Sequence, residues 1–229
     1  MELSADLNSF APGLHNISMT GIALILLISQ DAAELLANYE AAWAGVQDYS
    51  CTLTTAEKVG DDTEYTSYRV LYMRPGWVNY TQLEGDRKGS KATYDPNTGK
   101  VNASLGGVLG FIKVTADPTD SRVTSKRGER MDQSDFGWIL KDWKAYLAAG
   151  KVSVTGEDTK GDIPVYRLVA KGLDPEKENG SARIVMYLRA DNWLPYQTIH
   201  YDSDGNVLLK ATFKDLKLNQ GLKEKDFKI

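Results

Sequence analysis

The stretch Tyr65–Tyr80, YTSYRVLYMRPGWVNY, constrains the fold more than any other part of this chain. Its aromatic and β-branched residues favour a β-strand, in which successive side chains point to opposite faces. Tyr68, Val70 and Tyr72 then share one face. The Arg-Pro-Gly that follows ends the strand, because proline has no amide hydrogen to donate to a ladder. Two adjacent strands this aromatic need a large apolar partner from the rest of the chain.

Composition places the chain among soluble globular proteins with one sizeable core. It has 229 residues, of which 42% are hydrophobic and 25% are charged. All-β and mixed domains often reach this length, so we expect a single domain over residues 31–229. The net charge of −4 argues against a broad nucleic-acid-binding surface. The one short basic cluster is predicted to be a solvated loop or strand face; it comprises Arg122, Lys126, Arg127 and Arg130.

Residues 1–30 form a polar tail that contains one apolar run, Gly21–Ile28. The run is far shorter than the ~20 apolar residues that a membrane-spanning helix requires. Its length is typical of the hydrophobic region of a signal peptide, but no Lys or Arg precedes it. Two interpretations remain open: the run is the buried start of the first helix, or it is an atypical export signal.

The remainder of the chain predicts two helices within a succession of strands. Asp31 could cap a helix that runs to about Val46, and Asp135 could cap a second helix over Phe136–Ala149. Strands before and after the second helix, without βαβ alternation, predict an α+β fold with a largely antiparallel sheet. The expected strands are Tyr49–Val59, Ser67–Met73, Trp77–Leu83, Lys91–Tyr94, Lys100–Ala103, Val152–Gly156, Pro164–Lys171, Ala182–Arg189, Pro195–Tyr201 and Val207–Leu216.

An apolar, glycine-rich run, Leu105–Phe111, interrupts the predicted strands. Three glycines make it too flexible for a good strand, and it lacks the Gly-Lys-Ser/Thr ending of a phosphate-binding loop. It is either a buried crossover loop or a mobile apolar flap over a cavity.

Residue types that carry catalysis or bind metals are sparse. The lone Cys51 is typical of a small buried hydrophobe. The two histidines, His15 and His200, lie far apart, so any histidine-centred site would rest on His200 alone. The acidic run Asp202–Asn206 lies between two strands and is better explained as a hairpin turn than as a calcium loop. We therefore expect no catalytic residue, no metal site and no cofactor.

Two stretches resemble the LolA/LolB-like superfamily of bacterial envelope lipoprotein carriers, within an uncharacterised branch of outer-membrane lipoprotein-sorting-like proteins. One is Val70–Tyr80, an alternating strand followed by a basic residue, a proline, a turn and an aromatic strand. The other is Trp193–Leu222, with a Trp-Leu-Pro entry, a Tyr-Asp-x-Asp-Gly turn and a closing strand. The order of helices and strands over most of residues 31–229 is also similar.

The resemblance implies a curved antiparallel half-barrel wrapped around helices, with an apolar cavity for acyl chains. The gating arginine of the family corresponds to Arg74, which would hydrogen-bond a lid at Leu105–Ile112 and release it on loading. The protein would then bind acyl lipid or lipoprotein in the periplasm or cell envelope, with membrane-associated donor and acceptor proteins and without nucleic acid. The ligand-binding residues would be Arg74 and the walls Tyr68, Val70, Tyr72, Trp77, Leu105, Leu109, Phe111 and Ile112.

Two other functions remain open on the sequence. The first is a protein-interaction module that keeps the same fold with a filled core and binds a partner through its sheet. The second is a hydrolase on the concave face, which would need two close carboxylates in a cleft with at least one shifted pKa. The non-enzymatic carrier is the function that we predict.

Overall fold

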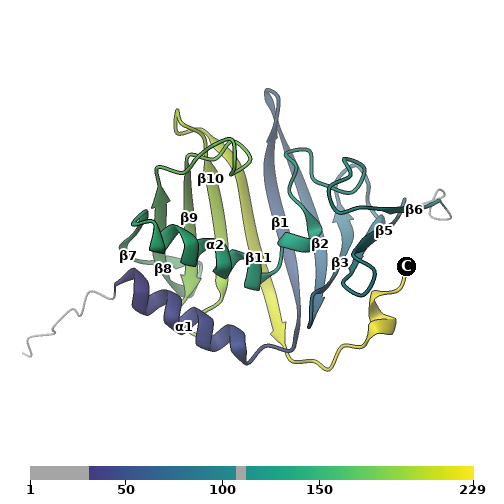
Figure 1. Cartoon of the computed structure of the whole chain (residues 1–229), viewed down its shortest axis with the longest axis horizontal. Helices are drawn as coiled ribbons and strands as arrows, with labels where there is room; N and C mark the ends of the chain where they lie inside the picture. Colours follow the sequence, from purple (N-terminus) through teal and green to yellow (C-terminus); the bar gives the residue numbers. More distant parts are fainter. Residues whose placement is uncertain (1–30, 107–111) are drawn as a thin grey trace, which may run out of the picture.

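The computed structural model describes residues 31–106 and 112–229 (Figure 1). The expectations for residues 1–30, and for Leu109 and Phe111 as ligand contacts, lie outside these residues. Within the described part of the chain, no helix is long and apolar enough to cross a membrane.

Eleven strands of the described chain form one open antiparallel sheet, which two α-helices accompany, and this confirms the predicted α+β class. The helices are α1 (Ala32–Ala44) and α2 (Phe136–Ala148), and short 3-10 helices occur at η2 (Met131–Gln133) and η3 (Glu224–Phe227). The strands are β1 (Asp48–Val59), β2 (Asp62–Met73), β3 (Trp77–Glu84), β4 (Lys91–Asp95), β5 (Lys100–Ser104), β6 (Lys113–Ala116), β7 (Val152–Lys160), β8 (Ile163–Lys171), β9 (Arg183–Arg189), β10 (Pro195–Tyr201) and β11 (Val207–Leu218). Strand β6 was not predicted, because its four residues follow the glycine-rich run and no tight turn marks them as the return strand of a hairpin.

Both helices begin at the aspartates that the sequence indicated. The Asp31 carboxylate accepts a hydrogen bond from the Glu34 amide at 2.7 Å. The Asp135 carboxylate accepts from the amides of Gly137 at 2.6 Å and Trp138 at 3.2 Å. These bonds satisfy amides that have no partner within the first turn of a helix.

The strand order decides which face of the sheet is covered. It runs β6-β5-β4-β3-β2-β1-β11-β10-β9-β8-β7, so β1 and β11 pair in the middle while β6 and β7 form the two edges. The chain therefore has to cross from one edge to the other between Ala116 and Val152. Figure 1 shows this connection, which includes α2, and helix α1 lying on the same face of the sheet. We call this the helix face and the opposite side the open face.

Aromatic rings fill the centre of the helix face. Tyr49 stacks on Tyr72 with ring centroids 5.0 Å apart and on Phe136 at 4.6 Å. Phe136 meets Phe213 edge to face at 5.0 Å, and Trp43 lies 5.2 Å from Tyr72. These rings come from α1, α2 and three central strands, so one packed cluster joins both helices to the sheet.

Removing one hydroxyl from this cluster tests how tightly the helices are joined. The Tyr39 hydroxyl on α1 donates a 2.5 Å hydrogen bond to the carbonyl of Phe136, and both residues are fully buried. Tyr39→Phe is expected to lower the free energy of unfolding by about 1 kcal/mol, because a buried carbonyl loses a donor. Urea denaturation measures this as a lower midpoint at unchanged slope. Tyr65→Phe, at a side chain that is 74% exposed, is the control, and equal midpoints for the two variants would contradict the expectation.

Candidate functional site

The wall residues predicted on β2 do share one face. Tyr68, Val70 and Tyr72 all belong to the core cluster beneath the helices. Val70 and Tyr72 are each 3% exposed, whereas Tyr68 is half-buried and lies 5.5 Å from the ring of Tyr80. Together with their neighbours on β3 and β5, these residues make a continuous apolar surface under the connection between β6 and α2.

The structure places the other predicted wall residues apart from this surface. Trp77 pairs with Met73 in the ladder, and its ring packs on the open face 5.8 Å from Phe227 of η3. Trp77 was predicted to be part of the wall because it is close to Tyr72 in the sequence. The residue that it pairs with decides its face, and that residue, Met73, lies on the open face. Leu105 and Ile112 lie at the end of the β5–β6 hairpin and are 39% and 37% exposed.

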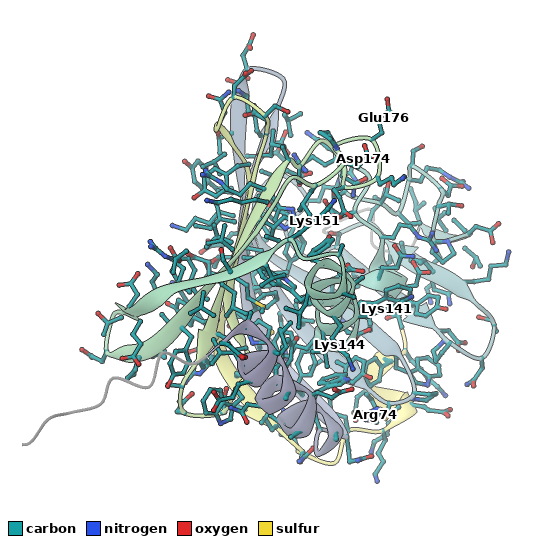
Figure 2. All side chains as sticks on the ribbon, turned by 60° about the vertical axis from the view of Figure 1, so that its left-hand side comes forward. Arg74, Lys141, Lys144, Lys151, Asp174 and Glu176 are labelled. Atoms are coloured by element: carbon teal, nitrogen blue, oxygen red, sulfur yellow. The ribbon has the colours of Figure 1, made fainter. Side chains whose placement is uncertain are left out.

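Arg74 binds the end of helix α1. Its Nε donates to the Val46 carbonyl at 2.6 Å and its Nη2 to the Trp43 carbonyl at 2.8 Å. The guanidinium also lies 5.0 Å from the Trp43 ring, and the Arg74 amide donates to the Gln47 carbonyl at 2.9 Å. Carbonyls at a helix C-terminus lack partners within the helix and carry partial negative charge, so a cation satisfies them well. Figure 2 shows Arg74 beside this end of α1.

Arg74 and Leu105, the described start of the predicted lid, are at opposite ends of the strands. The ladder connects Arg69 to Thr81, Thr81 to Lys91 and Lys91 to Ser104, so Leu105 begins beyond the level of Arg69. Arg74 lies five residues further in the other direction, which is about 16 Å along a strand. The structure does not bring Arg74 and Leu105 together, and the arginine holds a helix instead.

Residues 117–135, which we call the cover segment, lie over the helix face between β6 and α2 (Figure 1). The sequence did not indicate this role, although it placed the basic cluster in a solvated loop. The segment contains one short 3-10 helix, η2, which packs against β4. Its apolar contacts with the core come from Val123 and Met131. Irregular segments of this length within a compact domain are uncommon and are often functional.

Polar contacts hold the cover segment in place. The Glu57 carboxylate on β1 accepts from the Ser125 hydroxyl and from the Arg127 amide, both at 3.0 Å. Lys126 pairs with Glu64 on β2. Such bonds at a partly exposed site can be exchanged for bonds to water, so each one adds little to the cost of opening.

The tyrosine hydroxyls of the apolar surface and the nearby Cys51 thiol stay protonated at neutral pH. Burial raises the pKa of Tyr72 to about 12, and it also raises the pKa of Tyr68. Burial raises the pKa of the Cys51 thiol to about 12, so this cysteine stays protonated. The chemistry that this surface offers is apolar contact with a few neutral hydroxyls.

Two hollows among the described residues lie away from the helices. One, of about 380 Å³, is at the edge of the sheet between β7 and β8 and includes Tyr166. The other, of about 390 Å³, is on the open face beside Trp77 and Phe227. At the centre of the helix face, the rings of Tyr49, Tyr72 and Phe136 fill the space between the sheet and the helices.

Two polar arrangements bear on the hydrolase alternative. The Ser181 hydroxyl lies 3.2 Å from Nδ1 of His200, but Ser181 is fully buried, and burial lowers the pKa of His200 to about 4. On α2, burial and then the charge of Glu178 raise the pKa of Asp142 to about 6. Neither Asp142 nor Glu178 lines either hollow. Within the described residues, no group of three or more potential metal ligands is placed to hold a metal ion.

Comparison with known proteins returns likeness in structure but not in sequence. No protein-family model matches the chain, and no curated protein matches it. An uncharacterized conserved protein from Thermus thermophilus has 16% identity and a TM-score of 0.56, with 86% of this chain and 93% of that chain covered. MucB has 15% identity and a TM-score of 0.53, and the match covers 86% of this chain but 62% of MucB. The lipoprotein LppX of Mycobacterium tuberculosis has 13% identity and a TM-score of 0.51, with 84% and 98% covered.

These likenesses concern the fold. At such low identities a shared architecture does not carry residue roles with it. The chain therefore shares its overall fold with these three proteins.

Replacing Arg74 tests its contact with the helix. Arg74→Leu is expected to lower the free energy of unfolding by about 1–2 kcal/mol, because two charge-assisted bonds to helix carbonyls are lost at an exposed site. Arg74→Lys should restore less than half of this loss, because an ammonium cannot span both carbonyls as the planar guanidinium does. Hydrogen exchange of the last turn of α1 should accelerate in both variants. Arg69→Leu, on an exposed strand position, is the matched control; an equal loss there would show that Arg74 has no special role.

The raised pKa of Asp142 predicts a pH-dependent effect on stability. A folded-state pKa near 6, above the ordinary value of 3.8, means that the charged carboxylate opposes folding at neutral pH and that this cost disappears as pH falls through 6. Asp142→Asn should therefore raise the unfolding free energy at pH 7.5 by about 0.5–1 kcal/mol, given its exposure, and by less at pH 5. Thermal unfolding at both pH values measures this difference. Asp162→Asn, in an exposed turn, controls for net charge, and a destabilised Asp142→Asn at pH 7.5 would refute the expectation.

Proposed function

We propose that this protein is a non-enzymatic carrier that binds the acyl chains of a lipid or lipoprotein between the helix face and the cover segment. The observation that carries this proposal is the contrast between the two surfaces that meet there. The wall is aromatic and aliphatic, whereas the segment that covers it is held mainly by polar contacts. The described structure is then the closed, unloaded form.

The wall has the chemistry that an acyl chain requires. Val70, Val78 and Val101 are at most 3% exposed, and Tyr68 and Tyr80 border them. An acyl chain gains about 0.8 kcal/mol for each methylene that it buries, so a chain of lipid length could replace the contacts now made by the cover segment. We infer that the sheet curves around the helices enough to enclose such a chain.

Opening would occur at the cover segment and not at the aromatic cluster. Separating α2 from Tyr49 and Phe213 would break dense ring packing, which is costly. Releasing Ser125 and Lys126 from their glutamates exchanges these bonds for bonds to water. Arg74 would keep α1 attached to the β2–β3 turn during this motion, which gives it a positioning role at the site.

A protein-binding function on a filled core is the second candidate. The stacked rings of Tyr49, Tyr72 and Phe136 support it, because they occupy the space where a LolA-like carrier would need a cavity. A complex of MucA and MucB from Pseudomonas aeruginosa is one of the similar structures, with a TM-score of 0.50. In either case we place the protein in the periplasm or cell envelope, with membrane-associated donor or acceptor proteins as partners for the carrier.

A charge introduced into the wall separates the two candidates. Tyr68 is half-buried on the helix face, so Tyr68→Glu can be tolerated by the fold while it places a carboxylate where an acyl chain would lie. Uptake of a fluorescent fatty acid by the detergent-free protein should be saturable for the wild type. It should weaken at least about tenfold for Tyr68→Glu, because each 1.4 kcal/mol lost is tenfold in affinity.

Tyr65→Glu is the matched control, because it makes the same change three residues away on the open face of the same strand. Solvent extraction and mass spectrometry of the purified wild type then identify any lipid that it carries. Saturable uptake that both variants retain would reject the assigned wall. A lipid-free wild type with no uptake would reject the carrier and favour the protein-binding candidate.

A further inference from the structure

The open face of the sheet carries a concentration of positive charge. Residues that pair across neighbouring strands point to the same face of the sheet. The strand register therefore shows which side chains lie on the open face. One row joins Arg69, Thr52 and Lys214, and the row two residues away ends in Arg167. The nine basic residues that the register places on this face in β1, β2, β8, β9 and β11 are Lys58, Arg69, Arg167, Lys171, Arg183, Arg189, Lys210, Lys214 and Lys217.

Carboxylates do not balance these cations. In the same strands the register assigns one acid to the open face, Asp48, which is 4% exposed and accepts from the backbone amides of Gln220 and Gly221. A second acid, Asp215, lies in the bulge of β11. Among the described residues, Arg189 is the only one of the nine in an ion pair, with Asp191. Because the whole chain has a net charge of −4, its charge is strongly polarised between surfaces.

The same face has an apolar component that no α-helix of the described chain covers. Val165, Val169, Val185 and Tyr187 form a cluster that is at most 8% exposed. The stems of long basic side chains shield it, with the Arg183 guanidinium 4.0 Å from the Tyr201 ring. The Arg183 Nε is buried and has no hydrogen-bond acceptor within the described residues. The Arg183 guanidinium therefore keeps an unused hydrogen-bond donor at this face.

Exposed apolar side chains lie among the cations at one end of the face. Tyr65 is 74% exposed and shares a row with Lys210 through Ala56, and Val207, at 46% exposed, pairs with Tyr201. Tyrosine is favoured where water meets the headgroups of a bilayer. Six adjacent strands give this surface a breadth of about 24 Å.

We propose that the open face binds the surface of an anionic phospholipid bilayer. Lysine and arginine would meet lipid phosphates over a wide area, and Tyr65 would enter the headgroup layer. This site is separate from the acyl-binding surface, which lies on the other face of the sheet. Docking by the open face would leave the helices and the cover segment directed away from the membrane.

Vesicle flotation with the full chain tests this proposal. The wild type should bind vesicles that contain phosphatidylglycerol, fail to bind vesicles of phosphatidylcholine alone, and dissociate as salt is raised. The double variant Lys210→Glu with Lys214→Glu reverses two exposed charges on the open face. Each basic residue near an anionic surface is worth about fivefold in partitioning, so the pair should weaken binding by more than about tenfold.

The matched control makes the same charge change on the opposite side of the molecule. Lys141 and Lys144 are exposed residues of α2, on the helix side in Figure 2, and Lys141→Glu with Lys144→Glu should keep binding within about threefold of the wild type because these residues face away from the bilayer. Thermal unfolding confirms that both variants are folded.

Three results would overturn the proposal: equal loss in both double variants, wild-type binding without preference for phosphatidylglycerol, or binding to duplex DNA but not to vesicles. Fatty-acid uptake is measured without vesicles, so its failure is distinguishable from failure of this proposal.

Discussion

The path that the chain takes from β6 to β7 is the constraint on which the rest of the structure depends. These strands are the two edges of an eleven-stranded sheet, which would be about 48 Å across if flat. Helix α2 spans about 20 Å of that distance at 1.5 Å per residue. The cover segment has to supply much of the rest, so one face of the sheet must be covered while the other stays open.

The two parts of this connection cover the sheet in different ways. Helix α2 brings Phe136 into contact with Tyr49 and Phe213, and Tyr39 adds a buried hydrogen bond from α1. The cover segment contributes Val123 and Met131 and otherwise relies on polar contacts with the sheet. The same apolar strands therefore lie under a firmly packed cover on one side and a loosely held one on the other. Under the proposed function, the cover segment is the part that would open to admit a ligand.

Local sequence information was sufficient to predict the helices and strands, but not the contacts between them. The caps at Asp31 and Asp135, and the alternation of Tyr68, Val70 and Tyr72, depend on neighbours in the chain, and the structure has them as predicted. The face of Trp77 and the contact of Arg74 with α1 depend on register and strand order, which are non-local. The basic open face was also missed, because its cations are scattered singly along five strands and meet only across the ladder.

If the protein carries acyl chains and docks on a membrane as proposed, the two faces of the sheet would separate these two tasks. The wall residues and the open-face cations alternate along the same strands, so Val70 and Arg69 are neighbours that point in opposite directions. A change in one set can therefore leave the other intact. The same two strands also connect the two faces. Glu57 on β1 and Glu64 on β2 hold the cover segment. Lys58 on β1 and Arg69 on β2 lie on the open face. Adjacent residues on two strands would then link contact with a membrane to the hold on the cover segment.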